Sequence, residues 1–218
     1  MSNAKKVILL KEVYSTQAEV IREGNHVFLD GIFMEGDVKN NNGRMYPGDI
    51  LEREAEKFGV LVNEGRAVGE LDHPESLSIN LDRVSHLVET LKRNPGTSQW
   101  AGRIKLMDTP MGRIAKELTE SGLKLAISSR GVGSLTEDDD ETNVVGEDYN
   151  LITYDLVHSP GAPNAFLNIR EAKEYILEAG RYYPITRLLP EYDSVENHNV
   201  EHYAKDITRY IKKLRSST

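Results

Sequence analysis

The apolar residues in the first part of the chain occur in short runs that are separated by glycine. Between residues 7 and 38 these runs are broken at Gly24, Gly31 and Gly36. Short apolar runs with glycine between them are typical of strands and turns. The sequence therefore predicts a core that consists mostly of strands.

Further segments along the chain carry the same strand pattern. A turn signal, Asn94-Pro95-Gly96, separates two of them, which predicts a hairpin. The predicted strands are residues 67–71, 84–91, 100–107, 123–127 and 150–157.

Helices are predicted to flank this β core. Pro47 and Asp49 begin the first helix, whereas Thr109 caps the second and Pro110 occupies its first turn. Gly122 is expected to end the second helix. The inner faces are expected to hold Leu51, Ala55 and Phe58 in the first helix, and Ile114, Ala115 and Leu118 in the second.

The chain has 218 residues, which is enough for one sizeable core and a smaller appendage. Its character changes near residue 170, so residues 1–170 are predicted to form one domain and residues 171–218 a C-terminal tail. The tail is expected to contain a helix over 171–179, a linker over 182–199 and a second helix over 200–214. The predicted fold class is α+β.

The composition excludes several classes of function. The chain has no cysteine, so disulfides, thiolate zinc sites and a cysteine nucleophile are excluded. Its formal net charge of −8 argues against a general affinity for nucleic acid or anionic membranes. The apolar run over residues 7–10 is far shorter than the roughly 20 residues of a membrane span. We therefore expect a cytoplasmic protein with no nucleic-acid or membrane partner.

One histidine has the context of a catalytic base. A serine nucleophile needs a base to take its proton, and histidine is the natural base near neutral pH. Among six histidines, His73 lies at a predicted strand end, with Glu70 and Asp72 before it and Pro74 behind it. A surface-loop histidine is the alternative.

Glu70, Asp72 and His73 are also metal-ligand types. However, no HExxH motif and no nucleotide-binding motif is present, so we predict no metal and no cofactor.

A pair of serines follows the strand predicted over residues 123–127. Ser128 and Ser129 lead into Arg130, and Gly131 and Gly133 come next. Glycine lets backbone N–H groups approach a ligand closely, as an oxyanion hole requires. The alternative interpretation is a Ser/Gly-rich turn without chemistry.

Asp155 lies in a predicted apolar strand, where a carboxylate is costly unless it has a partner. Orienting a catalytic histidine would supply that partner. Two alternatives are left open: Asp155 faces water at a strand edge, or His158 takes the orienting role.

These segments, in this order, resemble the prohead core proteases of T-even-like bacteriophages. The likeness spans roughly residues 28–166. The first block is Gly31-Ile32-Phe33-Met34 followed by Asn40, Asn42, Arg44, Tyr46 and Pro47. The second is residues 69–74, the third is residues 128–136, and a weaker fourth joins Asp155 to Pro160, Ala162, Pro163 and Ala165.

The resemblance implies a fold like that of the herpesvirus assemblin proteases, a β-barrel surrounded by helices. It also implies a serine endopeptidase that acts inside the prohead, in the host cytoplasm, on scaffold or core proteins and the major capsid protein. Assemblins are activated by dimerisation, so a homo-oligomer is left open. The alternative is a non-catalytic capsid or tube-like structural protein on the same fold.

Residue by residue, the resemblance assigns His73 as the base, Ser128 as the nucleophile and Asp155 as the group that orients the imidazole. Ser129 is the alternative nucleophile, because herpesvirus-type nucleophiles have a glycine two residues on. Strand alternation favours Ser128, which shares a face with Lys124 and Ala126 and not with the apolar residues Leu125 and Ile127.

Two residues that follow the serine pair, Arg130 and Gly131, are expected to assist catalysis. Backbone N–H groups near Arg130 and Gly131 are assigned to the oxyanion. The Arg130 side chain is expected to position the loop or to meet an acidic residue of the substrate.

Related phage proteases favour cleavage after glutamate, with a large aliphatic residue two positions earlier. We therefore hypothesise that self-cleavage after Glu178 or Glu191 removes the C-terminal tail. The triplets of this kind are Leu10-Lys11-Glu12, Ile176-Leu177-Glu178 and Leu189-Pro190-Glu191.

Overall fold

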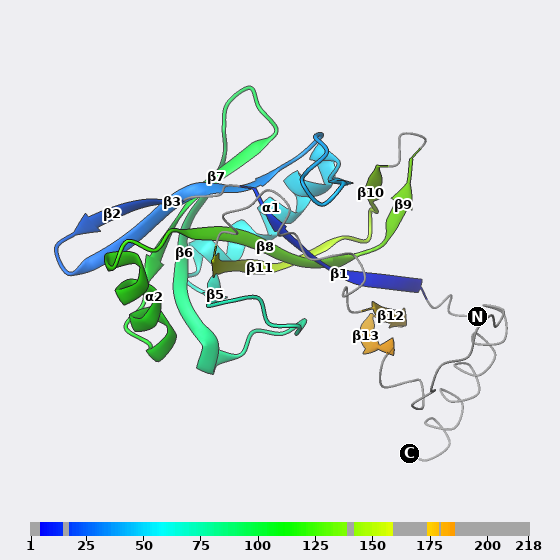
Figure 1. Cartoon of the computed structure of the whole chain (residues 1–218). Helices are drawn as coiled ribbons and strands as arrows, with labels where there is room; N and C mark the ends of the chain where they lie inside the picture. Colours follow the sequence, from blue (N-terminus) through cyan, green and yellow to red (C-terminus); the bar gives the residue numbers. More distant parts are fainter. Residues whose placement is uncertain (1–4, 15–17, 139–141, 159–173, 179, 186–218) are drawn as a thin grey trace, which may run out of the picture. The chain divides into compact units, whose positions relative to one another are not determined.

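The computed structural model describes residues 5–14, 18–138, 142–158, 174–178 and 180–185 (Figure 1). The chain divides into two compact units. The larger is Val7–Ala172, and the smaller combines Met1–Lys6 with Lys173–Thr218.

One sheet of the larger unit has β8 (Leu125–Gly133) at its centre. β8 pairs antiparallel with β1 (Lys5–Val13) on one side and with β11 (Asn150–His158) on the other. All nine residues of β8 are buried. The strand predicted to end at residue 127 therefore continues to Gly133. Pairing along both edges of β8 overrides the turn preference of its glycines and serines, a preference that is only local.

A second sheet has the strand order β2-β3-β7-β6-β5. β6 and β7 pair antiparallel, and Asn94 N donates to Gln99 O at 2.8 Å across the turn, which confirms the predicted hairpin. The short 3-10 helix η1 (Leu81–Arg83) precedes β6. The strands of this sheet are β2 (Glu19–Glu23), β3 (His26–Glu35), β5 (Val68–Glu70), β6 (Val84–Arg93) and β7 (Gln99–Leu106). A small third sheet contains β4 (Arg44–Met45), β10 (Asn143–Val145) and β9 (Leu135–Glu137).

The two larger sheets meet where the end of β5 lies beside β11. Leu71 forms a parallel bridge with Leu156, and Asp72 N donates to Leu156 O at 2.7 Å. Thr153 Oγ1 donates to Val68 O at 2.8 Å in the same region. The β core is therefore a half-barrel, which agrees with the predicted barrel architecture and brings the segment after β5 against β11.

The first helix follows its prediction. α1 (Gly48–Asn63) begins directly after Pro47, and Asp37 Oδ1 accepts from Gly48 N at 2.8 Å at the start of the helix. Leu51 and Phe58 are buried, as expected. The Phe58 ring meets Tyr154 edge-on with 5.1 Å between centroids, so α1 packs against β11.

The second helix begins as predicted but presents a different face to the core. α2 (Pro110–Glu120) is capped by Thr109, whose Oγ1 accepts from Gly112 N at 3.0 Å. The predicted inner face is wrong in part, because Ile114 and Leu118 are 45% and 37% exposed. The buried residues of α2 are Gly112, Ala115 and Thr119. A Cβ on Gly112 would lie 2.0 Å from the carbonyl oxygen of Met107, so the small residues face a close neighbouring backbone and the large ones face outward.

In the smaller unit, the described part of the C-terminal tail consists of strands and not of the predicted helix and linker. The helix predicted over 171–179 is wrong where the structure describes it, because Glu174–Glu178 is strand β12. β12 forms a hairpin with β13 (Arg181–Pro184), which replaces the start of the predicted linker. Tyrosine and isoleucine favour strands, and Gly180 supplies a positive φ of 74° at the turn. The predicted helix over 200–214 and the predicted boundary near residue 170 lie outside the described residues.

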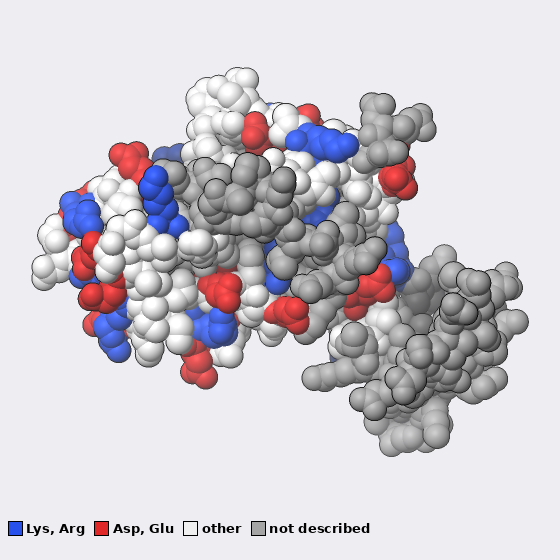
Figure 2. All heavy atoms as spheres, in the orientation of Figure 1, with Lys and Arg blue, Asp and Glu red and all other residues white. Residues whose placement is uncertain are grey.

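Among the helices that the structure describes, none is long and apolar enough to cross a membrane. On the face drawn in Figure 2, acidic and basic side chains are interspersed over the described surface. The negative net charge is therefore not gathered into a single patch on that face.

A buried histidine supports the join between the sheets. His86 on β6 is fully buried, with Nε2 3.0 Å from Tyr154 O and Nδ1 2.9 Å from Ser85 Oγ. A Cβ on Gly69 would lie 2.3 Å from His86 Nε2 and 2.0 Å from Tyr154 O, so only glycine fits there. Burial lowers the pKa of His86 to about 4, with the charge of Asp155 and the hydrogen bond to Tyr154 opposing this effect.

This histidine is expected to make stability depend on pH. The unfolded chain protonates His86 near pH 6.5, whereas the folded protein does so only near pH 4. The unfolded state therefore binds more protons in this interval, so stability falls as the pH falls. We expect the titration of His86 to lower the free energy of unfolding by about 3 kcal/mol as the pH falls over this range. Urea unfolding of the wild type and of His86→Gln from pH 7 to pH 4 measures this loss. The prediction is contradicted if the free energy of unfolding depends on pH equally in the two proteins.

Candidate active site

A row of side chains crosses the sheet at the end of the β1–β8 ladder. Ser128 on β8 is the register partner of Val13 on β1 and of Asp155 on β11. Directly opposed residues in antiparallel strands project from the same face of the sheet. The sheet register therefore places the Ser128 hydroxyl and the Asp155 carboxylate side by side.

The loop after β5 brings an imidazole over this row. Asp72 is held against β11 by its hydrogen bond to Leu156 O and has a φ of 66°, in the left-handed region that few residues other than glycine adopt. Asp72 Oδ1 also accepts from His73 N at 2.9 Å. The residue that follows Asp72, His73, lies between Ser128 and Asp155. Backbone strain of this kind is common at functional sites.

The three side chains form a continuous hydrogen-bonded series. His73 Nδ1 lies 2.9 Å from Asp155 Oδ2, and His73 Nε2 lies 2.5 Å from Ser128 Oγ. A carboxylate only accepts, so Nδ1 carries the hydrogen and Nε2 is left as the acceptor for the serine proton. Ser128 and Asp155 are fully buried, whereas the imidazole is 13% exposed. Of the three side chains, the one open to solvent is therefore the imidazole, which the sequence predicts to be the base.

The Asp155 carboxylate has partners on several sides. Burial alone would raise the pKa of Asp155, but the hydrogen bond from His73 and the charge of Arg130 outweigh burial and hold that pKa below its ordinary value. Arg130 Nε donates to Oδ2 at 2.7 Å and Arg130 Nη2 to Oδ1 at 3.2 Å. Glu70 N donates to Oδ1 at 3.1 Å. Asp155 is therefore ionised and fixed in orientation.

The burial of the Arg130 side chain excludes one of its two predicted roles. Its side chain is fully buried and also donates to Glu70 Oε2 and, at 2.6 Å, to Ser76 O. It therefore cannot meet an acidic residue of a substrate. Arg130 and Gly131 have register partners on both β1 and β11, so the segment that was expected to be a loop is part of a strand. The assignment of backbone N–H groups near these residues to the oxyanion stays a prediction.

The sequence interpretation missed the role of Glu70 as the second carboxylate on Arg130. The available signal was the one used for Asp155, since a charge within an apolar strand requires a partner. The sequence pattern by itself indicated Glu70 only as an acid near His73 and as a metal-ligand type. In the described ranges, no group of three or more histidine, aspartate or glutamate side chains is arranged to hold a metal ion.

The second serine lies on the opposite face of β8. The register partners of Ser129 are Glu12 and Tyr154, which belong to the neighbouring row. Because β8 is buried on both faces, the alternation of polar and apolar residues could not choose between the serines. The contact that distinguishes the two serines is that of His73 Nε2, which lies 2.5 Å from Ser128 Oγ. His158, the other candidate for orienting the base, is exposed at the end of β11.

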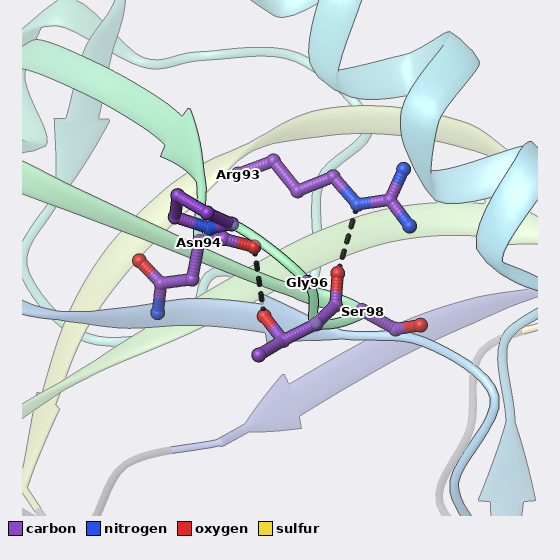
Figure 3. Close-up of a pocket in the computed structure, with 6 residues that line it drawn as sticks. Arg93, Asn94, Gly96 and Ser98 are labelled. Atoms are coloured by element: carbon purple, nitrogen blue, oxygen red, sulfur yellow. Dashed lines mark hydrogen bonds between the residues drawn. The ribbon is translucent and has the colours of Figure 1, made fainter.

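A hollow drawn in Figure 3 lies away from these residues. It is lined by the β6–β7 turn, from Arg93 to Ser98. Arg93 Nε donates to Thr97 O at 2.9 Å and Thr97 Oγ1 donates to Asn94 O at 3.0 Å, so the turn holds its own shape (Figure 3). None of the three residues of the candidate site lines it.

The model of the prohead core protein serine protease family matches residues 4–176. The chain belongs to that family. It is 29% identical over 153 residues to the prohead core protein protease of Enterobacteria phage T4, which covers 68% of this chain and 71% of that protein. The structure of the bacteriophage T4 capsid assembly protease superposes with a TM-score of 0.64 at 26% identity, over 71% of this chain and 99% of that chain. The resemblance inferred from the sequence blocks is thereby confirmed.

Proposed function

We propose that this member of the prohead core protease family is a serine endopeptidase that cleaves scaffold or core proteins and capsid proteins inside the phage prohead. The observation that carries the proposal is the series from Asp155 through His73 to Ser128. A nucleophile, a base within hydrogen-bond distance and a third group that orients the base are the parts that this chemistry needs. The T4 relatives are named as a prohead core protein protease and a capsid assembly protease.

Each residue has a role in the proposed mechanism. Ser128 Oγ attacks the scissile carbonyl carbon while His73 Nε2 takes the proton of the Ser128 hydroxyl. Asp155 keeps Nδ1 protonated and stabilises the imidazolium that forms. His73 then gives its proton to the leaving amine, and water hydrolyses the acyl-enzyme with His73 again as the base.

A fluorophosphonate probe tests the proposal, because it reacts with activated serines. We expect the wild type to label at Ser128 and Ser128→Ala to remain unlabelled. A chelator is expected to leave labelling unchanged, since the proposed mechanism uses no metal. A structural protein on this fold would not label at all, and a metal-dependent hydrolase would instead lose activity to the chelator.

We also propose that cleavage follows glutamate and that the chain processes its own tail. Glu178 is the last residue of β12 and pairs with Arg181, the first residue of β13, so the bond that follows Glu178 lies beyond the end of the strand. Gly180 nearby is exposed, and exposed bonds outside strand pairing are common sites of proteolysis. Glu191 lies outside the described residues. The triplet Leu10-Lys11-Glu12 lies within β1, where pairing with β8 protects the backbone.

Intact-mass measurement tests the processing. Wild type and Ser128→Ala are co-expressed with the cognate scaffold and then incubated. We expect scaffold fragments and a shortened chain ending at Glu178 or Glu191 only with the wild type. Identical intact masses for the two proteins would count against self-cleavage.

A further inference from the structure

A further buried carboxylate lies next to the candidate site, on the opposite face of the sheet. Glu12 on β1 is 2% exposed and accepts four side-chain hydrogen bonds. Asn40 and Asn42 donate to Oε2 at 2.8 and 2.5 Å, and Arg44 and Tyr46 donate to Oε1 at 2.6 and 2.9 Å. These donors are the polar residues of the first block of family resemblance, to which the proposed mechanism gives no role.

The segment that carries these donors, residues 40–46, is itself fixed. Asn40 Oδ1 accepts from Asn42 N at 2.9 Å and from Arg44 N at 3.0 Å, and Asn40 N donates to Arg44 O at 2.8 Å. Tyr46 is buried and meets Tyr149 edge-on, with 5.2 Å between the ring centroids. The segment is therefore a preorganised receptor for one carboxylate.

The backbone of Glu12 contacts the proposed nucleophile. Ser128 Oγ donates to Glu12 O at 2.9 Å and lies 2.5 Å from His73 Nε2. The hydroxyl has one hydrogen and two acceptors within reach. Rotation about the Cβ–Oγ bond moves this hydrogen from Glu12 O to His73 without moving the oxygen. The Glu12 carbonyl therefore holds the oxygen in line with the base.

The hydrogen bonds that residues 40–46 donate to the Glu12 carboxylate form a side-chain anchor. This anchor acts where the pairing between β1 and β8 is weakest. Val13 is the last residue of β1, and Val13–Ser128 is the last register pair between β1 and β8. Strand ends open more readily than strand centres. Asn42 Nδ2 also donates to Lys11 O at 3.2 Å, so residues 40–46 hold β1 at two successive residues.

We propose that Glu12 is a positioning residue for Ser128, and that residues 40–46 act on the nucleophile through it. The proposal rests on the proposed function, since it concerns the same serine. The side-chain anchor fixes the Glu12 backbone, and the Glu12 carbonyl fixes the Ser128 hydroxyl. Loss of the anchor therefore slows attack by the serine without changing the surface that meets the substrate.

The test compares rates of fluorophosphonate labelling, corrected for the folded fraction, together with kcat and KM on a scaffold-derived peptide. Small displacements of a catalytic group cost up to about 100-fold in rate, so we expect Glu12→Gln to label about 10- to 100-fold more slowly. Its KM is expected to stay unchanged. Tyr46→Phe removes one hydrogen bond and keeps the ring, so it is expected to show a smaller loss in kcat alone.

Glu54→Gln is the matched control. Glu54 is 1% exposed and accepts from Arg53, Lys57 and Leu151 N, but it bonds none of the three residues of the candidate site. We expect its labelling rate per folded molecule to equal that of the wild type.

The outcomes separate the two proposals. If the wild type labels and folded Glu12→Gln labels at the same rate, or Glu54→Gln slows equally, the positioning role is wrong and the protease assignment stands. If the wild type does not label, both are wrong. If Glu12→Gln does not fold, Tyr46→Phe decides, and an unchanged kcat in that variant overturns the positioning role.

Discussion

Ser128→Ala is expected to lower peptide cleavage by about 10,000-fold or more, whereas Ser129→Ala is expected to retain most of the activity. His73 Nε2 lies 2.5 Å from Ser128 Oγ, and Ser129 belongs to the neighbouring row on the other face of β8. A serine without a base is a poor nucleophile at neutral pH. Cleavage of a scaffold-derived peptide by the purified variants measures the difference.

The two variants control for each other, because they lose one hydroxyl each from adjacent positions of one buried strand. Ser128 and Ser129 are 0% and 2% exposed, so similar effects on folding are expected. Urea unfolding checks this similarity. Abolished cleavage in Ser129→Ala with full cleavage in Ser128→Ala would reverse the assignment of the nucleophile.

Arg130→Met is expected to lower the free energy of unfolding by about 3–5 kcal/mol. The Arg130 guanidinium is fully buried and donates to the carboxylates of both Asp155 and Glu70. Without it, two buried acids lie close together with no cation between them. Urea unfolding at pH 7 measures the loss. Removal of the cation raises the pKa of Asp155, so the loss is expected to shrink as the pH falls and Asp155 becomes protonated.

The double variant Arg130→Met, Glu70→Gln separates charge from packing. It removes one acid together with the cation, so we expect it to recover part of the lost stability. Arg130→Lys keeps the charge but cannot make the paired hydrogen bonds to Asp155, so it is expected to fall between the wild type and Arg130→Met. A loss below about 1 kcal/mol in Arg130→Met would show that Asp155 does not depend on this ion pair.

The sequence alone determined the features that depend on neighbouring residues. Asn94-Pro95-Gly96 predicted the turn between β6 and β7, and Thr109-Pro110 predicted the start of α2. Turn and cap signals act through hydrogen bonds and φ angles within a few residues, so they can be found without the rest of the fold. The ordered blocks around His73 and Ser128 indicated the family for the same reason, because they are short and contiguous.

Only the tertiary structure decided which residues meet. Ser128 and Ser129 are alike in sequence, and the sheet register together with the loop at Asp72 decides which hydroxyl reaches His73. Arg130 looked like part of a turn, but pairing along both edges of β8 makes it the buried partner of Asp155. The pattern over residues 174–178 suits a helix or a strand, and pairing with β13 selects the strand. These outcomes depend on contacts between segments far apart in the chain, and local pattern carries no information about such contacts.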